Sequence, residues 1–137
     1  MKHEKSCGAI LYQTTDQGPL YLLIKHQNGG HWAFTKGHVE GSESEIETAQ
    51  REIQEEVGLT VTINPHFRKT TTYSPKEGVD KEVVYFLAPV TEGAITVQEE
   101  EVRQFAWLSY DQALDRLSYP NDQALLREAE AYLKSLN

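Results

Sequence analysis

The sequence has little cysteine, no long apolar run and fewer basic than acidic residues. Its one cysteine, Cys7, cannot close a disulfide within the chain and cannot build a structural zinc site from thiolates alone. A reducing, cytoplasmic location is the expectation that follows. No apolar stretch approaches the roughly 20 residues of a membrane span, and the start MKHEKSCGAILYQ lacks the apolar region and cleavage site of an export signal. We therefore expect no membrane partner.

The shortage of basic residues restricts the possible partners. With 13 basic and 21 acidic residues the net charge is −8, which argues against a nucleic acid as partner. The acidic residues are clustered, because residues 40–56 hold seven glutamates and one arginine and residues 99–101 are three glutamates. Such clusters form either a solvated acidic face or a site for divalent cations. The spacing of the glutamates decides between the two.

The size and composition predict one domain, residues 1–137. Its 39% hydrophobic residues suit a packed core, and oligomeric state is left open. Strand-like runs are found at 5–13, 20–27, 59–73, 81–90 and 102–108, and helical patterns at 42–59, 111–117 and 121–136. Because strands precede and follow the first helix and two helices end the chain, we expect an α/β domain with a mixed sheet between helical layers.

The first helix carries clear signals at both ends. Ser42 and Glu45 have the spacing of a capping box, and Gly58 stands where a left-handed C-cap is common. Its apolar side is predicted from four residues at helical spacing: Ile46, Ala49, Ile53 and Val57.

Three glutamates share one face of that helix. Glu52, Glu55 and Glu56 are related by i+3 and i+4, so their like charges repel and destabilise the helix by themselves. A hard cation with oxygen ligands would offset this repulsion. Mg²⁺ is the best match, with Mn²⁺ as a possible substitute. The face therefore predicts a divalent metal site.

The segment before the helix completes a longer pattern. Alone, the glycine-rich GGHWAFTKGHVEGSE is a weak signal for a loop that approaches a ligand. Together with the helix it has Gly37, five residues, Glu43, seven residues and then REIQEEVGL, which matches the Nudix box at each of its nine defined positions. The sequence thus resembles the Nudix hydrolases, which cleave a nucleoside diphosphate linked to another moiety.

The resemblance implies a fold and a set of site residues. The fold is the Nudix fold, an α/β/α sandwich with a mixed β-sheet. Arg51 and Glu43 are implied to form an ion pair that orients the catalytic face, although a surface pair of little energetic value is the alternative. Metal binding is implied for Gly37, Glu52, Glu55, Glu56 and, from a separate loop, Glu101.

Glu101 has alternatives close by in the sequence. In QEEEVRQFAWL its neighbours Glu99 and Glu100 could reach the metals instead, or all three could form a solvated loop. Its role is also open, because the carboxylate could be the general base or a further metal ligand.

Much of the chain also resembles one subfamily, the asymmetrical diadenosine tetraphosphate hydrolases. The similar segments are SCGAILYQ, HWAFTKGHVEGSE, KEVVYFLAPV and VRQFAWLSYDQAL. The resemblance implies metal-dependent cleavage of the tetraphosphate to ATP and AMP by water. One departure is Thr35, which stands where the subfamily has proline, and threonine does not stiffen a loop as proline does.

Substrate-binding residues follow from the same resemblance. Cations at His31, Lys36, His38 and Lys81 would stabilise the phosphate chain. Tyr73 and Tyr119 match aromatic positions that sandwich an adenine, and the alternative is that both pack against edges of the core.

Other functions remain open on the sequence alone. One is cleavage of RNA 5′ ends or inositol pyrophosphates, of which RNA is the weaker choice because the chain has no basic stripe. Another is a silent Nudix domain that binds a nucleotide to regulate a partner. The box retains all its carboxylates, which favours an active enzyme.

Overall fold

The computed structural model describes residues 2–27, 29–91, 95–98 and 102–136. In chain order the elements are β1 (Lys2–Thr15), β2 (Gly18–His26), β3 (Trp32–Ala33), β4 (Thr35–His38), α1 (Glu45–Val57), β5 (Asn64–Lys76), β6 (Val79–Pro89), β7 (Val102–Leu108), α2 (Tyr110–Arg116) and α3 (Pro120–Ser135).

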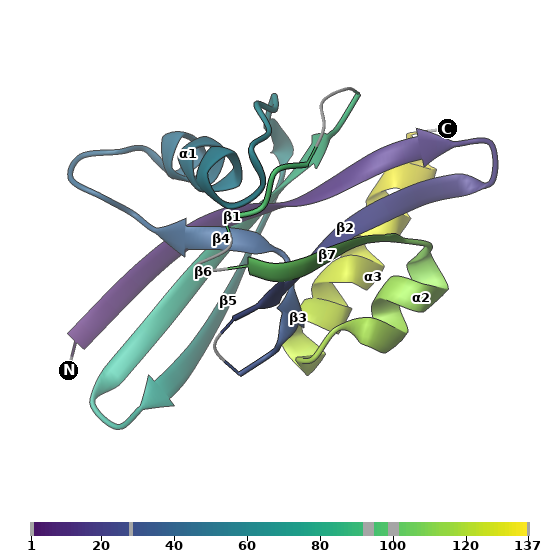
Figure 1. Ribbon diagram of the computed structural model, residues 1–137. Helices are drawn as coiled ribbons and strands as arrows, with labels where there is room; N and C mark the ends of the chain where they lie inside the picture. Colours follow the sequence, from purple (N-terminus) through teal and green to yellow (C-terminus); the bar gives the residue numbers. More distant parts are fainter. Residues whose placement is uncertain (1, 28, 92–94, 99–101, 137) are drawn as a thin grey trace.

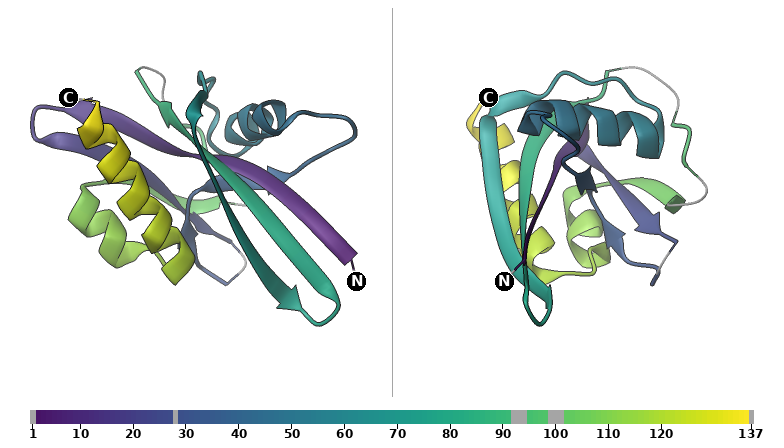
Figure 2. Two further views of the ribbon diagram at one scale, coloured as in Figure 1. Left: turned by 180° about the vertical axis from the view of Figure 1, so that it is seen from behind. Right: turned by 90° about the vertical axis from the view of Figure 1, so that its left-hand side faces the viewer.

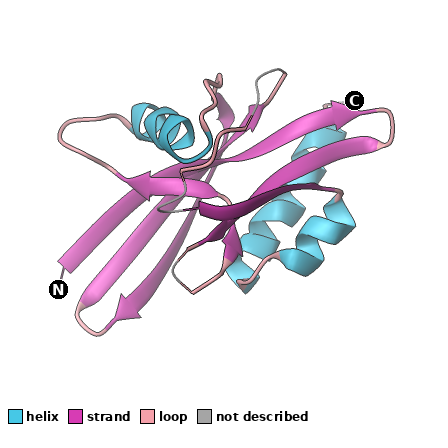
Figure 3. Ribbon diagram, viewed as in Figure 1, coloured by secondary structure: helices cyan, strands magenta, loops and turns pink. Residues whose placement is uncertain are grey.

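The strands form one mixed sheet, as predicted. Its main order is β3-β2-β1-β6-β5, and β4 pairs with β1 while β7 pairs with β2. β1 is parallel to β6 and antiparallel to β2 and β4. α1 covers one face, and α2 and α3 cover the other (Figures 1 and 2). This is the three-layer arrangement expected from the sequence, and Figure 3 shows how the helices flank the strands.

The core has a part on each face of the sheet. On the α1 side, Ile53 and Val57 of the helix pack against alternate residues of β1, including Cys7. On the other side, Phe34 and Tyr85 pack under α2 and α3. Burial raises the pKa of the Cys7 thiol to about 11, so this thiol is inert at neutral pH. No helix in the described ranges is long and apolar enough to cross a membrane.

The start of α1 differs from the prediction. The N-cap is Ser44, whose hydroxyl accepts from the Glu47 N–H, and the Glu47 side chain accepts from the Ser44 N–H, so the capping box lies two residues after the predicted one. The predicted box fails because Glu45 lies within the helix and pairs with Lys5 and Arg68. The predicted C-cap is confirmed, since Gly58 has a φ of 73°.

Two strand predictions were also wrong in part. The run at 59–73 is not one strand, because β5 begins only at Asn64. Apolar and polar residues alternate over 59–63 because Leu59, Val61 and Ile63 pack into the α1-side core. This packing does not require the segment to pair with a strand. Conversely, the segment interpreted as a plain loop contains β3 and β4, which are too short to give a periodic signal.

The corrected capping box gives a direct test. Ser44→Ala removes the acceptor for the Glu47 N–H and should lower the free energy of unfolding by about 1 kcal/mol. Ser42→Ala is the matched control, because Ser42 is exposed and precedes the helix, so its effect should stay within about 0.5 kcal/mol. Urea unfolding measures both. Equal losses in the two variants would contradict the observed cap.

Candidate active site on α1 and β4

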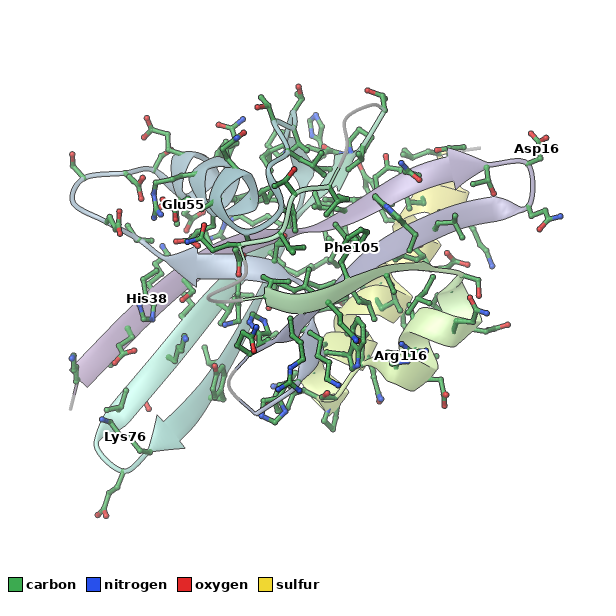
Figure 4. The ribbon with its side chains drawn as sticks, viewed as in Figure 1. Asp16, His38, Glu55, Lys76, Phe105 and Arg116 are labelled. Atoms are coloured by element: carbon green, nitrogen blue, oxygen red, sulfur yellow. The ribbon has the colours of Figure 1, made fainter. Side chains whose placement is uncertain are left out.

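The predicted glutamate face lies on the side of α1 that meets β4. Glu56 is buried, with 2% of its surface exposed, Glu52 is largely buried, and Glu55 is half exposed. Figure 4 shows Glu55 on α1 and His38 at the end of β4. The three carboxylates thus run from the interior to the surface along the contact between helix and strand.

Arg51 connects this face to the preceding loop. Its Nε donates to Glu43 Oε2 at 2.7 Å and its Nη2 donates to Glu43 Oε1 at 3.0 Å. Its Nη1 donates to Glu52 Oε1 at 2.8 Å and to Glu55 Oε2 at 3.1 Å, and Nη2 also reaches the His38 carbonyl at 2.9 Å. The predicted Arg51–Glu43 pair is therefore present and is bidentate, the stronger form of such a pair.

The backbone of β4 lies directly against these carboxylates. The Lys36 N–H donates to Glu56 Oε1 at 3.0 Å. A Cβ on Gly37 would lie 1.9 Å from the Glu52 carboxyl carbon, so a side chain at this position would displace that carboxylate. This close approach is the physical reason for a glycine at the start of the box.

The chemistry of this site fits a hard divalent cation, because its side-chain donors are carboxylate oxygens. As placed in the structure, no three His, Cys, Asp or Glu side chains of the described ranges lie close enough together to hold a metal. Glu52 and Glu55 instead contact Arg51. Metal binding by Gly37, Glu52, Glu55 and Glu56 stays a prediction. Glu99, Glu100 and Glu101 lie outside the described residues.

Two predicted phosphate-binding lysines come together on the other face of the sheet. Gly8 pairs with Lys36 on one side and with Tyr85 on the other, and its missing side chain leaves room for Lys36. The Lys36 side chain reaches Lys81, whose pKa is lowered by burial and further by the charge of Lys36. Two adjacent ammonium groups repel, so an anion between them would be stabilised.

The predicted histidines have different surroundings. His31 lies with its ring centroid 5.0 Å from that of Tyr119. His26, which sequence analysis missed, lies near Lys36 and His31, and its pKa is lowered by burial and by both of these groups. His38 faces Glu4 instead, with 3.6 Å between Nε2 and Oε2. His26 and His31 therefore lie on the side of Lys36, whereas His38 faces Glu4.

The two predicted stacking tyrosines are not core residues. Tyr73 and Tyr119 expose 41% and 44% of their surface, so both rings are partly open to solvent, and stacking on a base stays a prediction. Tyr73 is the cross-strand partner of Lys81, and the charges of Tyr119 and Asp122 add to the rise in its pKa that burial causes. Tyr73 thus lies beside Lys81, and Tyr119 lies near Tyr73.

Sequence analysis also missed Asp122 in the first turn of α3. Burial raises its pKa to about 6, while the charge of Lys36 acts in the opposite direction. No spacing in the sequence connects Asp122 with Lys36, so only the fold brings them near each other.

An open hollow of about 660 Å³ adjoins this region, between the start of β1 and the β5–β6 hairpin. This volume is within the usual range of small-molecule sites, about 300–1,000 Å³. It is lined by His3, Glu4, Lys5, Thr72, Tyr73, Ser74, Asp80, Lys81 and Glu82.

Comparison with known families identifies the domain. The NUDIX domain model matches residues 2–129. The chain belongs to the Nudix family. It is a Nudix hydrolase with the mixed sheet and flanking helices of that fold, and Nudix hydrolases generally use a divalent metal.

Individual Nudix proteins are similar over nearly the whole chain. The asymmetrical bis(5′-nucleosyl)-tetraphosphatase of Sus scrofa is 34% identical over 96% of this chain and 97% of its own length. The Caenorhabditis elegans Ap4A hydrolase in a binary complex superposes with a TM-score of 0.89 at 28% identity, covering 96% of this chain and 98% of that chain. A NAD-capped RNA hydrolase of Haemophilus influenzae is 34% identical over 81% of this chain, but only 42% of its own length is covered.

The Arg51–Glu43 contact predicts a pH dependence. Hydrogen bonds from Arg51 lower the pKa of Glu43 from 4.5 to about 2. The pair therefore stabilises the fold fully above pH 4.5, and this contribution is lost as pH falls toward 2. Glu43→Gln should be less stable than wild type at neutral pH, and the difference should shrink below pH 4.5.

Urea unfolding from pH 7 down to about 2.5 measures this difference across the range in which carboxylates titrate. The control is Glu77→Gln in the exposed β5–β6 hairpin, which should follow wild type at every pH. A Glu43→Gln difference that stays constant with pH would show that the pair does not depress the pKa of Glu43.

Proposed function

We propose that this Nudix hydrolase cleaves diadenosine tetraphosphate asymmetrically, to ATP and AMP. The observation that supports this best is the lysine pair, because the Lys36 backbone contacts Glu56 while Lys81 is the cross-strand partner of the exposed Tyr73. A substrate with bases and a long anionic chain matches such an order of groups. The similarity to the bis(5′-nucleosyl)-tetraphosphatase of Sus scrofa over nearly the whole chain also supports it.

In this proposal the carboxylates Glu52, Glu55 and Glu56 hold Mg²⁺, or Mn²⁺ in its place, with the Gly37 backbone beside them. The bound ion supplies positive charge to the phosphates and polarises the attacking water. Glu52 and Glu55 would exchange their contacts with Arg51 for the cation, while Glu43 keeps Arg51 in place.

The remaining steps use the chain's own side chains. Lys36 and Lys81 bind the phosphate chain and stabilise the charge that develops on the leaving oxygen. Water adds its oxygen to one phosphorus, one P–O–P bridge breaks, and the proton of the water passes to a carboxylate base. Tyr73 and Tyr119 stack a base and so position the phosphates.

Product analysis tests the reaction. The purified protein with Mg²⁺ and diadenosine tetraphosphate in ¹⁸O-labelled water should give equal amounts of ATP and AMP, with one labelled oxygen in one product. Glu56→Gln removes one carboxylate at nearly constant shape and should lose most turnover. Two molecules of ADP, or preferred turnover of triphosphorylated RNA or inositol pyrophosphates at equal concentration, would contradict the proposal. Nucleotide binding without turnover would indicate a regulatory domain.

The aromatic pair gives a second prediction. Tyr119→Ala should lower kcat/KM for diadenosine tetraphosphate by the factor that corresponds to a loss of about 1–3 kcal/mol of stacking energy. Tyr73→Ala should have a similar effect. Turnover of a polyphosphate substrate without a base should change little, because the carboxylates and lysines remain.

Phe105→Ala is the matched control for these variants, because Phe105 on β7 exposes 41% of its surface, as Tyr73 does. All three variants should keep the melting temperature of the wild type within a few degrees. Equal losses on both substrates, together with a large fall in melting temperature, would make the tyrosines packing residues.

A further inference from the structure

Asp122 combines burial with the absence of a partner. It exposes 8% of its surface, and its N–H donates to the Tyr119 carbonyl at 3.1 Å, which fixes it within one turn of Tyr119. Within the described ranges no side chain or backbone group forms a hydrogen bond or ion pair with its carboxylate. A buried carboxylate without a partner is costly.

The carboxylate is buried but can still be reached. Among the described residues, the side-chain polar atom that is fully enclosed without a partner is Ser6 Oγ, so the Asp122 oxygens keep some contact with solvent. A ligand group can therefore approach them. The exchange of one water for a ligand donor would then satisfy the carboxylate.

The residues around Asp122 indicate the kind of ligand that it would bind. Its charge contributes to the raised pKa values of Tyr119, Tyr73 and Tyr85, on the loop before α3, on β5 and on β6. Lys36 on β4 is the nearby cation. Asp122 therefore lies one turn from Tyr119 and near Tyr73 and Lys36.

A purely structural role explains less. A carboxylate in the first turn of α3 interacts favourably with the helix dipole, by about 0.3–1 kcal/mol. An exposed aspartate at the same position would give this gain without the cost of burial. Asp111, in the first turn of α2, is such an exposed residue.

We propose that Asp122 binds the nucleoside, accepting a hydrogen bond from a donor of the unit that stacks on Tyr119. The donor is the exocyclic amino group of the base or the ribose 2′-hydroxyl, and a carboxylate can accept a hydrogen bond from either. Asp122 is then a specificity-determining residue that selects nucleosides carrying this donor. The inference rests on the proposed function for the identity of the ligand as a nucleotide.

Binding measurements test Asp122 without turnover. Dissociation constants for AMP, purine riboside 5′-monophosphate and 2′-deoxy-AMP are measured by NMR titration. Wild type should bind one of the two analogues roughly 10- to 100-fold more weakly than AMP, as expected for the loss of a hydrogen bond to a charged group. Which analogue is weakened identifies the donor.

The variants complete the test. Asp122→Ala should bind AMP roughly 10- to 100-fold more weakly and should no longer distinguish the three ligands. Asp111→Ala, the matched control, should behave as wild type. Asp122→Asn, which keeps an acceptor oxygen and removes the unpaired buried charge, should fold with at least the wild-type melting temperature.

Two outcomes would overturn the role of Asp122. One is a wild type that binds all three ligands equally or binds none of them, and the other is an Asp122→Ala variant that discriminates as wild type does. Neither outcome depends on whether the protein cleaves diadenosine tetraphosphate. A protein that discriminates the ligands through Asp122 but yields no ATP and AMP from diadenosine tetraphosphate would retain this inference while the proposed function fails.

Discussion

The arrangement of the site depends on the contacts of the Arg51 guanidinium. This guanidinium holds Glu43 through two hydrogen bonds and reaches Glu52 and Glu55 through Nη1. Without this cation, the like charges on one face of α1 would repel each other and weaken the helix. Because Glu43 comes from the loop before α1, the same guanidinium also fixes that loop against the helix.

The second constraint is the alternation of side chains along β4. Lys36 lies over Gly8 on one face of the sheet, while the next residue, Gly37, meets Glu52 on the other face. Two successive residues of one short strand therefore join the carboxylates to the lysine pair. Glycine at both Gly8 and Gly37 permits this, because a Cβ at either place would lie within 2 Å of a neighbouring atom.

The sequence predicts the elements that follow from local patterns. It gives no signal for residues that only the fold brings close together. The α1 face, the Gly58 cap and the mixed sheet were predictable, because periodicity and capping are local. The observed capping box lies two residues after the predicted one, and Glu45 pairs with the distant residues Lys5 and Arg68, which no local pattern indicates. Asp122 carries no local signal, because its burial beside Tyr119 and Lys36 comes from tertiary packing.

Arg51 contacts Glu43, Glu52 and Glu55, and the central proposal is that it would keep Glu43 and release Glu52 and Glu55 when a divalent cation binds. Carboxyl ¹³C NMR of the glutamate side chains during a Mg²⁺ titration tests it most directly. We predict that the Cδ signals of Glu52 and Glu55 move with a common dissociation constant while that of Glu43 stays in place. A Glu43 signal that moves together with them, or signals of Glu52 and Glu55 that do not move, would contradict the account.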